Sequence, residues 1–185
     1  MEIGIFDLET SGFNADNSIL LCCSSKTYNL PTITTVRADK FKTWKTNKTD
    51  EEEVIKAVCN QLLPYDIVVA HNGQWFDKGF LNAKCLEYGL SPVLRWKKLI
   101  DPCRLSRNHM RLGRNSLASL IDFLHIPTHK TPIELYEWRK ASHNSDVKSM
   151  NKIVHHCERD VETLELVYRK VKSLVDKIDK SGSAF

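Results

Sequence analysis

Three short apolar stretches near the start of the chain restrict the folds that it can adopt. They cover residues 2–8, 19–25 and 32–37, and each is bounded by Gly, Asn or Pro. Apolar runs of this length between turn-forming residues are typical of β-strands and are too short for helices. We therefore expect the chain to begin with an antiparallel meander of three strands.

The rest of the chain alternates between helical and strand patterns. Acids that suit a first helical turn, with Thr49 as a candidate cap, precede an apolar helical series: Val54, Ile55, Val58, Leu62 and Leu63. The further expected elements are a strand at 66–70, a helix at about 75–88, a strand at 97–101, helices around 117–124 and 133–141, and a long helix at about 146–178. The pattern predicts an α/β fold, in which a mixed sheet of about five strands, an antiparallel meander followed by parallel strands, is flanked by helices.

Length and composition fit a single domain. The 185 residues are 42% hydrophobic and 27% charged, and we expect one domain over residues 1–180 with a flexible tail at 181–185. No apolar run is long enough to span a membrane, and the first residues lack the pattern of a secretory signal. We therefore expect an intracellular protein without a membrane partner.

The six cysteines contain no C-x-x-C pair and lie mostly in apolar sequence, so buried, reduced thiols are expected. The alternative is a structural zinc site formed by His155, His156 and Cys157. It is disfavoured because such sites take their ligands from separated pairs on turns.

Positive charge is concentrated in two segments. Residues 95–114 contain seven Lys or Arg against one Asp, and residues 37–48 contain five against one, with Phe41 and Trp44 between them. Basic clusters with interleaved aromatic residues suit a phosphate backbone and stacked bases, although a solvated charged face has the same composition.

Four acids lie within apolar sequence. Asp7 and Glu9 share one face of the first strand, because residues i and i+2 of a strand point the same way. Asp77 stands between Phe76 and Phe80 after a strand end, and Asp160 lies near the apolar face of the last helix. Carboxylates in such places require a cation or a proton to offset their repulsion.

A divalent metal is the simplest partner for these acids. Four carboxylates without Cys or His at zinc spacing suit Mg²⁺ or Mn²⁺. Two such ions can clamp a phosphodiester, with one generating hydroxide from water and the other stabilising the leaving oxygen.

Three segments around these acids, IFDLETSGF, HNGQWFD and HHCERDV, occur in that order. With them the chain resembles the DEDD superfamily of 3′ to 5′ exonucleases, which have a ribonuclease-H-like fold. The motifs of that family are FDLET, N-x-x-x-F-D, and a histidine or tyrosine shortly before an aspartate. The chain is most similar to the single-domain branch related to the proofreading domain of family B DNA polymerases.

The resemblance implies a metal-dependent 3′ to 5′ exonuclease that releases nucleoside 5′-monophosphates from single-stranded ends of DNA or RNA. It implies that two Mg²⁺ or Mn²⁺ ions are held by four acids, Asp7, Glu9, Asp77 and Asp160. It places Asn72 beside the scissile nucleotide, and Thr10 with the following loop at the 3′ end. Trp75 suits either a substrate contact or the core, whereas the spacing of Phe76 and Phe80 favours the core for Phe76.

The third motif offers two histidines for activating water. Histidine-type members of the family have the spacing of His155, five residues before Asp160, and tyrosine-type members have that of His156, four before. On a continuous helix His156 would lie over the face of Asp160, whereas a loop before Cys157 would let His155 approach. Imidazoles suit the role because they titrate near neutrality. Both histidines remain candidates.

Other polar residues are expected to be structural. Asp101 suits the cap of a following helix, His71 and His125 suit structural positions, and Glu134 and Glu137 suit a helix surface. Two alternative functions remain, namely an RNA-directed or structure-selective nuclease on the same site, and a nucleic-acid-binding or scaffolding module without turnover. Retention of all four acids argues against the silent module. Protein partners are unknown from the sequence.

Overall fold

A five-stranded mixed sheet forms the centre of the computed structural model, which describes residues 1–128 and 133–175. Its strand order is β3-β2-β1-β4-β5. The strands are β1 (Ile3–Thr10), β2 (Leu20–Thr27), β3 (Ile33–Arg37), β4 (Ile67–Val69) and β5 (Lys98–Ile100). β1, β2 and β3 pair in antiparallel fashion, and β4 and β5 run parallel to β1. The predicted α/β architecture is confirmed.

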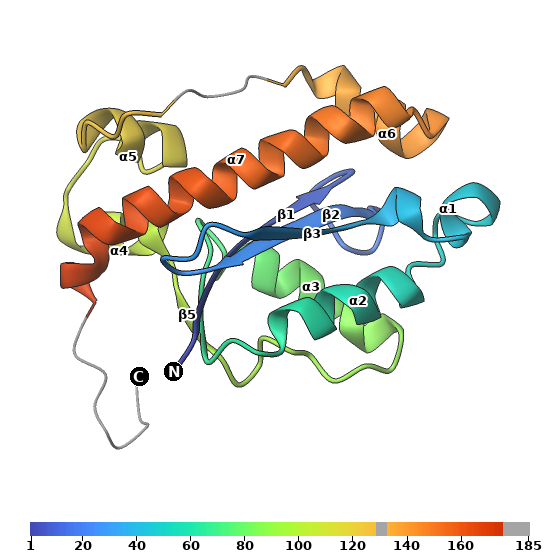
Figure 1. Ribbon diagram of the computed structural model, residues 1–185, viewed down its shortest axis with the longest axis horizontal. Coiled ribbons are helices and arrows are strands. Elements are labelled where there is room, and N and C mark those ends of the chain that lie inside the picture. Colours follow the sequence, from blue (N-terminus) through green and yellow to red (C-terminus); the bar gives the residue numbers. More distant parts are fainter. Residues whose placement is uncertain (129–132, 176–185) are drawn as a thin grey trace.

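Helices cover both faces of this sheet. They are α1 (Thr43–Thr46), α2 (Glu52–Leu62), α3 (Asp77–Glu87), α4 (Pro102–His109), α5 (Leu117–Phe123), α6 (Leu135–Asn144) and α7 (Val147–Val171). Figure 1 shows α7 along one face and α2 with α3 against the other. The predicted domain end at 180 and tail at 181–185 lie outside the described residues. Among the helices described, none combines the length and apolar character that crossing a membrane requires.

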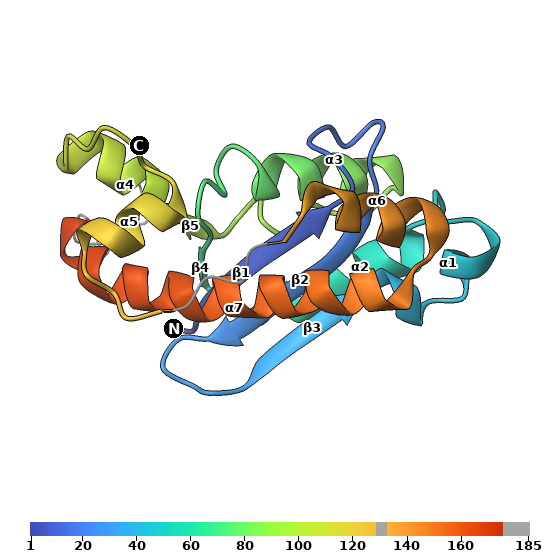
Figure 2. The same ribbon diagram turned by 90° about the horizontal axis from the view of Figure 1, so that it is seen from above.

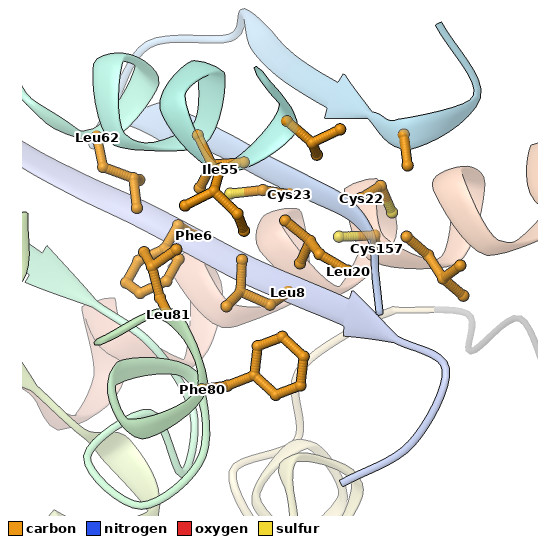
Figure 3. Packing of buried hydrophobic residues seen from close by; sticks show 14 of the residues in the cluster. Phe6, Leu8, Leu20, Cys22, Cys23, Ile55, Leu62, Phe80, Leu81 and Cys157 are labelled. Atoms are coloured by element: carbon orange, nitrogen blue, oxygen red, sulfur yellow. The ribbon is translucent and has the colours of Figure 1, made fainter. Parts of the chain in front are cut away.

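The alternation of β1 sends its side chains into two separate layers. Ile5 packs with Val161 and Leu164 of α7, whereas Phe6 and Leu8 pack in the cluster that contains α2 and α3 (Figure 3). Because side chains of a strand alternate between faces, Asp7 and Glu9 continue the row of Ile5. The apolar residues between the acids therefore fix both carboxylates on the α7 side of the sheet.

The parallel ladder beside β1 is short. β4 pairs only with the first half of β1, from Ile3 to Ile5, so the backbone of β1 beyond Ile5 has no strand on that side. At Gly4 a Cβ atom would lie 2.3 Å from the ring of Tyr65. Only glycine at position 4 leaves room for that ring against the start of β1. Because β4 pairs with β1 only as far as Ile5, β1 has no neighbouring strand on that side at Asp7.

Several local predictions were wrong. Thr49 does not cap α2: the residue before the helix is Glu51, which makes no side-chain capping bond. Glu51 is instead buried, accepts the Leu20 amide and pairs with Lys84. Leu63 lies beyond the end of α2 and is exposed. The tertiary ion pair overrides the local capping pattern.

Two further side chains differ from expectation. Glu137 is buried rather than at the surface, and bonds from Lys152 and Ser149 to its carboxylate hold its pKa down at about 2. Trp44 is buried in the core and cannot stack on bases. Glu134 is exposed as expected.

Candidate functional site

The acids of the first motif, Asp7 and Glu9, lie in the second half of β1, beyond the residues that pair with β4. Asp7 and Glu9 are partly accessible on the α7 side, with the Glu9 side chain 15% exposed. The Cys157 thiol of α7 donates to the Asp7 carbonyl at 3.4 Å. A small side chain at 157 lets α7 approach the strand beside these acids, and it thereby brings the third motif to the first.

Asp77 approaches β1 from the side on which β4 stops pairing after Ile5. It is the first residue of α3 and is 3% exposed. Its Oδ1 accepts the backbone amide of Leu8 at 3.2 Å. Because β4 stops early, this carboxylate occupies a position that a strand would otherwise fill. The bond fixes Asp77 against the strand that carries Asp7.

Asp160 and His156 lie together on α7. The His156 Nε2 atom is 3.7 Å from Asp160 Oδ2 and 3.9 Å from Glu9 Oε1. The helix is continuous through both histidines, so residues four apart share a face, and His155 is exposed on another side. The geometry therefore brings His156 to the acids and leaves His155 away from them.

The same helix argues against a zinc site at positions 155–157. Cys157 is buried while His155 is exposed, so consecutive side chains point to different sides of α7. All six cysteines are free, and five of them are buried. The expectation of buried thiols is confirmed for those five, and Cys59 is only partly buried.

Trp138 is a site residue that the sequence did not reveal. It comes from α6, and its Nε1 donates to Glu9 Oε2 at 3.0 Å. Its ring also meets His156 edge-on, with centroids 6.1 Å apart. Nothing in the residues around Trp138 marks it, since the contact depends on how α6 packs on α7.

The acids perturb one another. Burial is the main cause that raises the pKa of Glu9 to about 8 and that of Asp77 to about 7. The pKa of Asp7 is raised well above its usual range, by burial first and then by Cys157, Glu9, Asp77 and Asp160. Trp138 and the Leu8 amide act in the opposite direction, on Glu9 and Asp77 respectively. The site therefore places carboxyl groups where burial disfavours their ionised forms.

A groove of about 730 Å³ opens onto Asp7 and Asp77. Its other walls come from the loop after β1, from the loop before α3, and from α3, with Phe13, Asn72, Trp75 and Phe76 among them. Phe13 and Trp75 are 88% and 81% exposed. Phe76 packs against Phe80, as expected, and also meets Phe13. Exposed aromatic rings beside the acids offer surfaces on which a planar ring of a ligand can stack.

Thr10 does not line this groove. Its hydroxyl donates to the Gly12 carbonyl at 2.6 Å and it is 8% exposed. Thr10 therefore shapes the turn that follows, while the residues of that turn, Phe13 to Asp16, form the wall.

Asp101 has a wider role than the predicted helix cap. It accepts the amides of Cys103 and Arg104 at the start of α4, which confirms the cap. It also accepts the amides of Asn72, at 2.8 Å, and Gln74, at 3.3 Å. Asn72 has a φ of 61°, a conformation that costs energy unless its surroundings hold it. One buried carboxylate thus fixes the loop before α3.

His71 and His125, which were expected at structural positions, differ in their surroundings. His71 bonds the Asn115 carbonyl through Nε2 at 3.0 Å and also lines the groove. His125 is exposed, with a φ of 52°, just after α5. His71 thus tethers the loop before α3, and His125 ends a helix away from the acids.

The donor set can be compared with the needs of a divalent metal. Among the residues described, no three His, Cys, Asp or Glu side chains converge as a preassembled metal site. The chemistry fits nonetheless, because Asp7, Glu9 and Asp77 offer carboxylate oxygens with raised pKa values and no described Lys or Arg pairs with them. Hard cations prefer such oxygens and offset such charge.

The chain is similar to known proteins in both sequence and structure. The sequence pattern of the RNase_H superfamily matches residues 5–172. The family B DNA polymerase from the hyperthermophilic archaeon Pyrobaculum calidifontis has a similar fold, with a TM-score of 0.72 and 12% identity. The match covers 93% of this chain and 24% of that polymerase. Among curated proteins, no sequence matches this chain. The predicted ribonuclease-H-like fold is confirmed.

Proposed function

Because this chain belongs to the RNase_H superfamily and has a nuclease-type fold, we propose that it is a metal-dependent 3′ to 5′ exonuclease. Its substrate is the 3′ end of single-stranded DNA or RNA, and its product is a nucleoside 5′-monophosphate. The observation that carries this proposal is the meeting of three segments at the end of β1. There the Asp77 carboxylate accepts the Leu8 amide of the strand that carries Asp7. The Nε2 atom of His156 lies 3.7 Å from the Asp160 carboxylate and 3.9 Å from the Glu9 carboxylate.

The four acids would hold Mg²⁺ or Mn²⁺ in this proposal. Two such ions, when bound, supply the charge that activates water and neutralises the leaving oxygen. The protein supplies oxygen donors from three elements, β1, α3 and α7, which meet at the end of β1. Burial is the main cause of the raised pKa values of Glu9 and Asp77, so bound cations would also offset the cost of keeping these buried carboxylates ionised.

His156 is the proposed proton acceptor for the attacking water. It is the histidine beside Glu9 and Asp160, whereas His155 is exposed elsewhere. Trp138 touches both His156 and Glu9, so it orients the pair without needing to contact the substrate. It acts as a positioning residue.

The groove beside Asp7 and Asp77 is the proposed site of the terminal nucleotide. Trp75 and Phe13 present exposed rings there, and stacking on an aromatic ring accepts any base. Asn72 lies in the same wall, with its backbone fixed by Asp101. These features suit a strand end without a required sequence.

A gel time course tests the proposal. DNA and RNA of one sequence, each labelled at the 5′ end and single-stranded, are incubated with Mn²⁺, with Mg²⁺ or with chelator. We expect a ladder that shortens from the 3′ end, requires metal, and is absent with Asp7→Asn. Comparison of the two sugars identifies an RNA-directed enzyme, and hairpin substrates identify a structure-selective one. Intact substrate under every condition, despite a folded protein, would overturn the proposal.

A nucleic-acid-binding module without turnover is the second candidate. The observation that favours it is the lack, within the described residues, of three ligands already converged for a metal. Mn²⁺-dependent thermal stabilisation separates the two functions, because a ligand that binds only the folded protein raises its melting temperature. An intact site gives a shift that Asp7→Asn removes, and a silent module gives the same small shift in both proteins.

A further inference from the structure

The segment from α4 to the start of α5 presents an unusual arginine surface. We define it by four residues, Arg104, Arg107, Arg111 and Arg114, all of them exposed. Within residues 1–128 and 133–175, none of the four forms an ion pair, whereas Arg37, Arg159 and Arg169 each pair with an acid. No Asp or Glu occurs between Pro102 and Arg114. The positive charge of this surface is therefore available to an external anion.

Both ends of this segment are attached to the wall of the groove. At its start Asp101 accepts the amides of Asn72 and Gln74. At its end the Asn115 carbonyl is 3.0 Å from His71 Nε2, and Ser106 holds the Asn115 side chain. Figure 2 shows α4 near the loop that leads from β4 into α3. The arginine surface thus continues from the groove that reaches Asp7 and Asp77.

The other basic segment of the chain, residues 37–48, uses two of its five cations in structural contacts, while Lys40, Lys42 and Lys45 are exposed. Arg37 is held by Asp39 and Asn151, and Lys48 donates to the carbonyls of Ser142 and His143. The aromatic residue Trp44 is buried there. Charge count alone made both segments candidates for binding nucleic acid, and only the segment that contains the arginine surface combines exposed charge with attachment to the groove.

We propose that the arginine surface binds the phosphate backbone of the substrate strand on the 5′ side of the bond to be cleaved. This inference rests on the proposed function and assigns the path of the strand. An acidic site repels a polyanion, so attraction has to come from nearby fixed cations. The eight residues of α4 extend over about 12 Å, which is long enough to contact successive phosphates of one strand. Guanidinium groups suit phosphates because they form paired hydrogen bonds.

Equilibrium binding without turnover tests this path. Fluorescence anisotropy with a 5′-labelled single-stranded DNA, in chelator and over a salt series, gives the dissociation constant and its salt dependence. Arg104→Ala with Arg107→Ala should weaken binding at least tenfold and reduce the salt slope by about 1.4, because each single-strand phosphate contact adds about 0.7. The same pair changed to Lys should retain most of the slope.

A matched control removes the same charge elsewhere. Lys42→Ala with Lys45→Ala deletes two exposed cations at α1 that form no ion pair within the described residues, and should change affinity less than twofold. All variants should melt near the wild-type temperature, because exposed side chains away from special contacts contribute little to stability. Equal affinity losses in the arginine and lysine variants would show a diffuse charge effect and overturn the proposal, as would unchanged binding in the arginine variant.

The failure of this inference differs from the failure of the proposed function. Loss of binding in the arginine variant, together with no cleavage by the wild-type protein, would leave the surface and remove the exonuclease. A metal-dependent ladder from the wild-type protein, together with unchanged binding by the arginine variant, would support the exonuclease and overturn the role of the arginine surface.

Discussion

The indole of Trp138 donates a hydrogen bond to the Glu9 carboxylate over 3.0 Å, which joins α6 to the strand of the first motif. Burial raises the pKa of Glu9 and this bond lowers it, which leaves the pKa at about 8. Trp138→Phe keeps the ring and removes the donor, so Glu9 should lose its proton only at higher pH. We expect the acid limb of the pH–rate profile to shift upward at subsaturating Mn²⁺, where protons compete with the metal for Glu9, and the rate at pH 7 to fall about tenfold, as for a loss of roughly 1.4 kcal/mol.

Trp96→Phe is the control for that variant, because Trp96 is 79% exposed and contacts Arg95 rather than the acids. Its profile should match the wild type. A Trp138→Phe profile that is scaled down without moving along the pH axis would mean that the indole positions α6 only.

Stability without metal should depend on pH through Glu9 and Asp77. Both folded-state pKa values, about 8 and about 7, exceed the usual values of 4.5 and 3.8. Folding therefore favours the protonated carboxyls. The stability that this adds is fully present below the pKa values of the unfolded chain and is lost as the pH rises toward 8. We therefore expect the melting temperature of the metal-free protein to decrease as the pH rises from about 5 to about 8. Scanning calorimetry in chelator measures it.

Metal should oppose that loss. Saturating Mn²⁺ should raise the melting temperature more at pH 8 than at pH 5, since cations bind the ionised carboxylates. With Asp7→Asn the metal effect should vanish. A metal effect of equal size at both pH values would contradict the assignment of the raised pKa values to the binding groups.

The two adjacent histidines form a natural pair of variants. His156 lies beside Glu9 and Asp160, and His155 is exposed. His156→Ala should reduce the cleavage rate by about 10² to 10⁴, which is the usual contribution of a positioned general base, with little change in substrate binding. His155→Ala should stay within twofold of the wild type. Single-turnover rates distinguish them, and an inverted order would mean that α7 opens before Cys157.

Asp101 should matter to both the loop and the helix that it connects. Asp101→Ala removes the acceptor of four backbone amides, and loss of a helix cap alone costs about 1 kcal/mol. We expect a lower melting temperature and a raised KM, because Asn72 would no longer be held. Asp101→Asn keeps an oxygen and should lose less of both. Equal losses in the two variants would show that charge, rather than the acceptor, matters.

Two glycines should respond oppositely to alanine. Gly4→Ala places a Cβ 2.3 Å from the Tyr65 ring and should destabilise the protein, whereas Gly79 in α3 has no neighbour within 4 Å. Gly79→Ala should stabilise the protein by up to about 1 kcal/mol through helix propensity. Urea unfolding of both variants gives the comparison, and a stable Gly4→Ala protein would show that Tyr65 can move aside.

The sequence predicted elements whose pattern is local. The strands follow from apolar spacing, and their ranges differ from the structure by only a few residues, as with β1 at Ile3–Thr10. The long last helix, expected at about 146–178, begins as predicted, but α7 ends at Val171 and a 3-10 turn follows at Lys172–Leu174; residues 176–178 lie outside the described residues. The four acids were recognisable because charged residues interrupt apolar runs. Choosing between His155 and His156 required one further fact, namely that the helix continues through both.

The rest depends on contacts between distant segments. Trp138 reaches Glu9 across 129 positions of sequence, and Glu137 is buried because Lys152 and Ser149 of α7 satisfy it. Asp101 looked like a local cap because half of its bonds are local, and its bonds to Asn72 and Gln74 depend on the pairing of β4 with β5. No pattern in one segment contains that information.

The early end of β4 at Val69 decides how position 77 can be studied. The Asp77 carboxylate replaces a backbone carbonyl for the Leu8 amide, so Asp77→Ala would leave that amide unpaired and mix a folding defect with a chemical one. Asp77→Asn preserves the acceptor and isolates the loss of charge. Conversely, two strand residues inserted after Val69 would fill the same space with backbone, and the longer sheet would displace the acid that the shorter one accommodates.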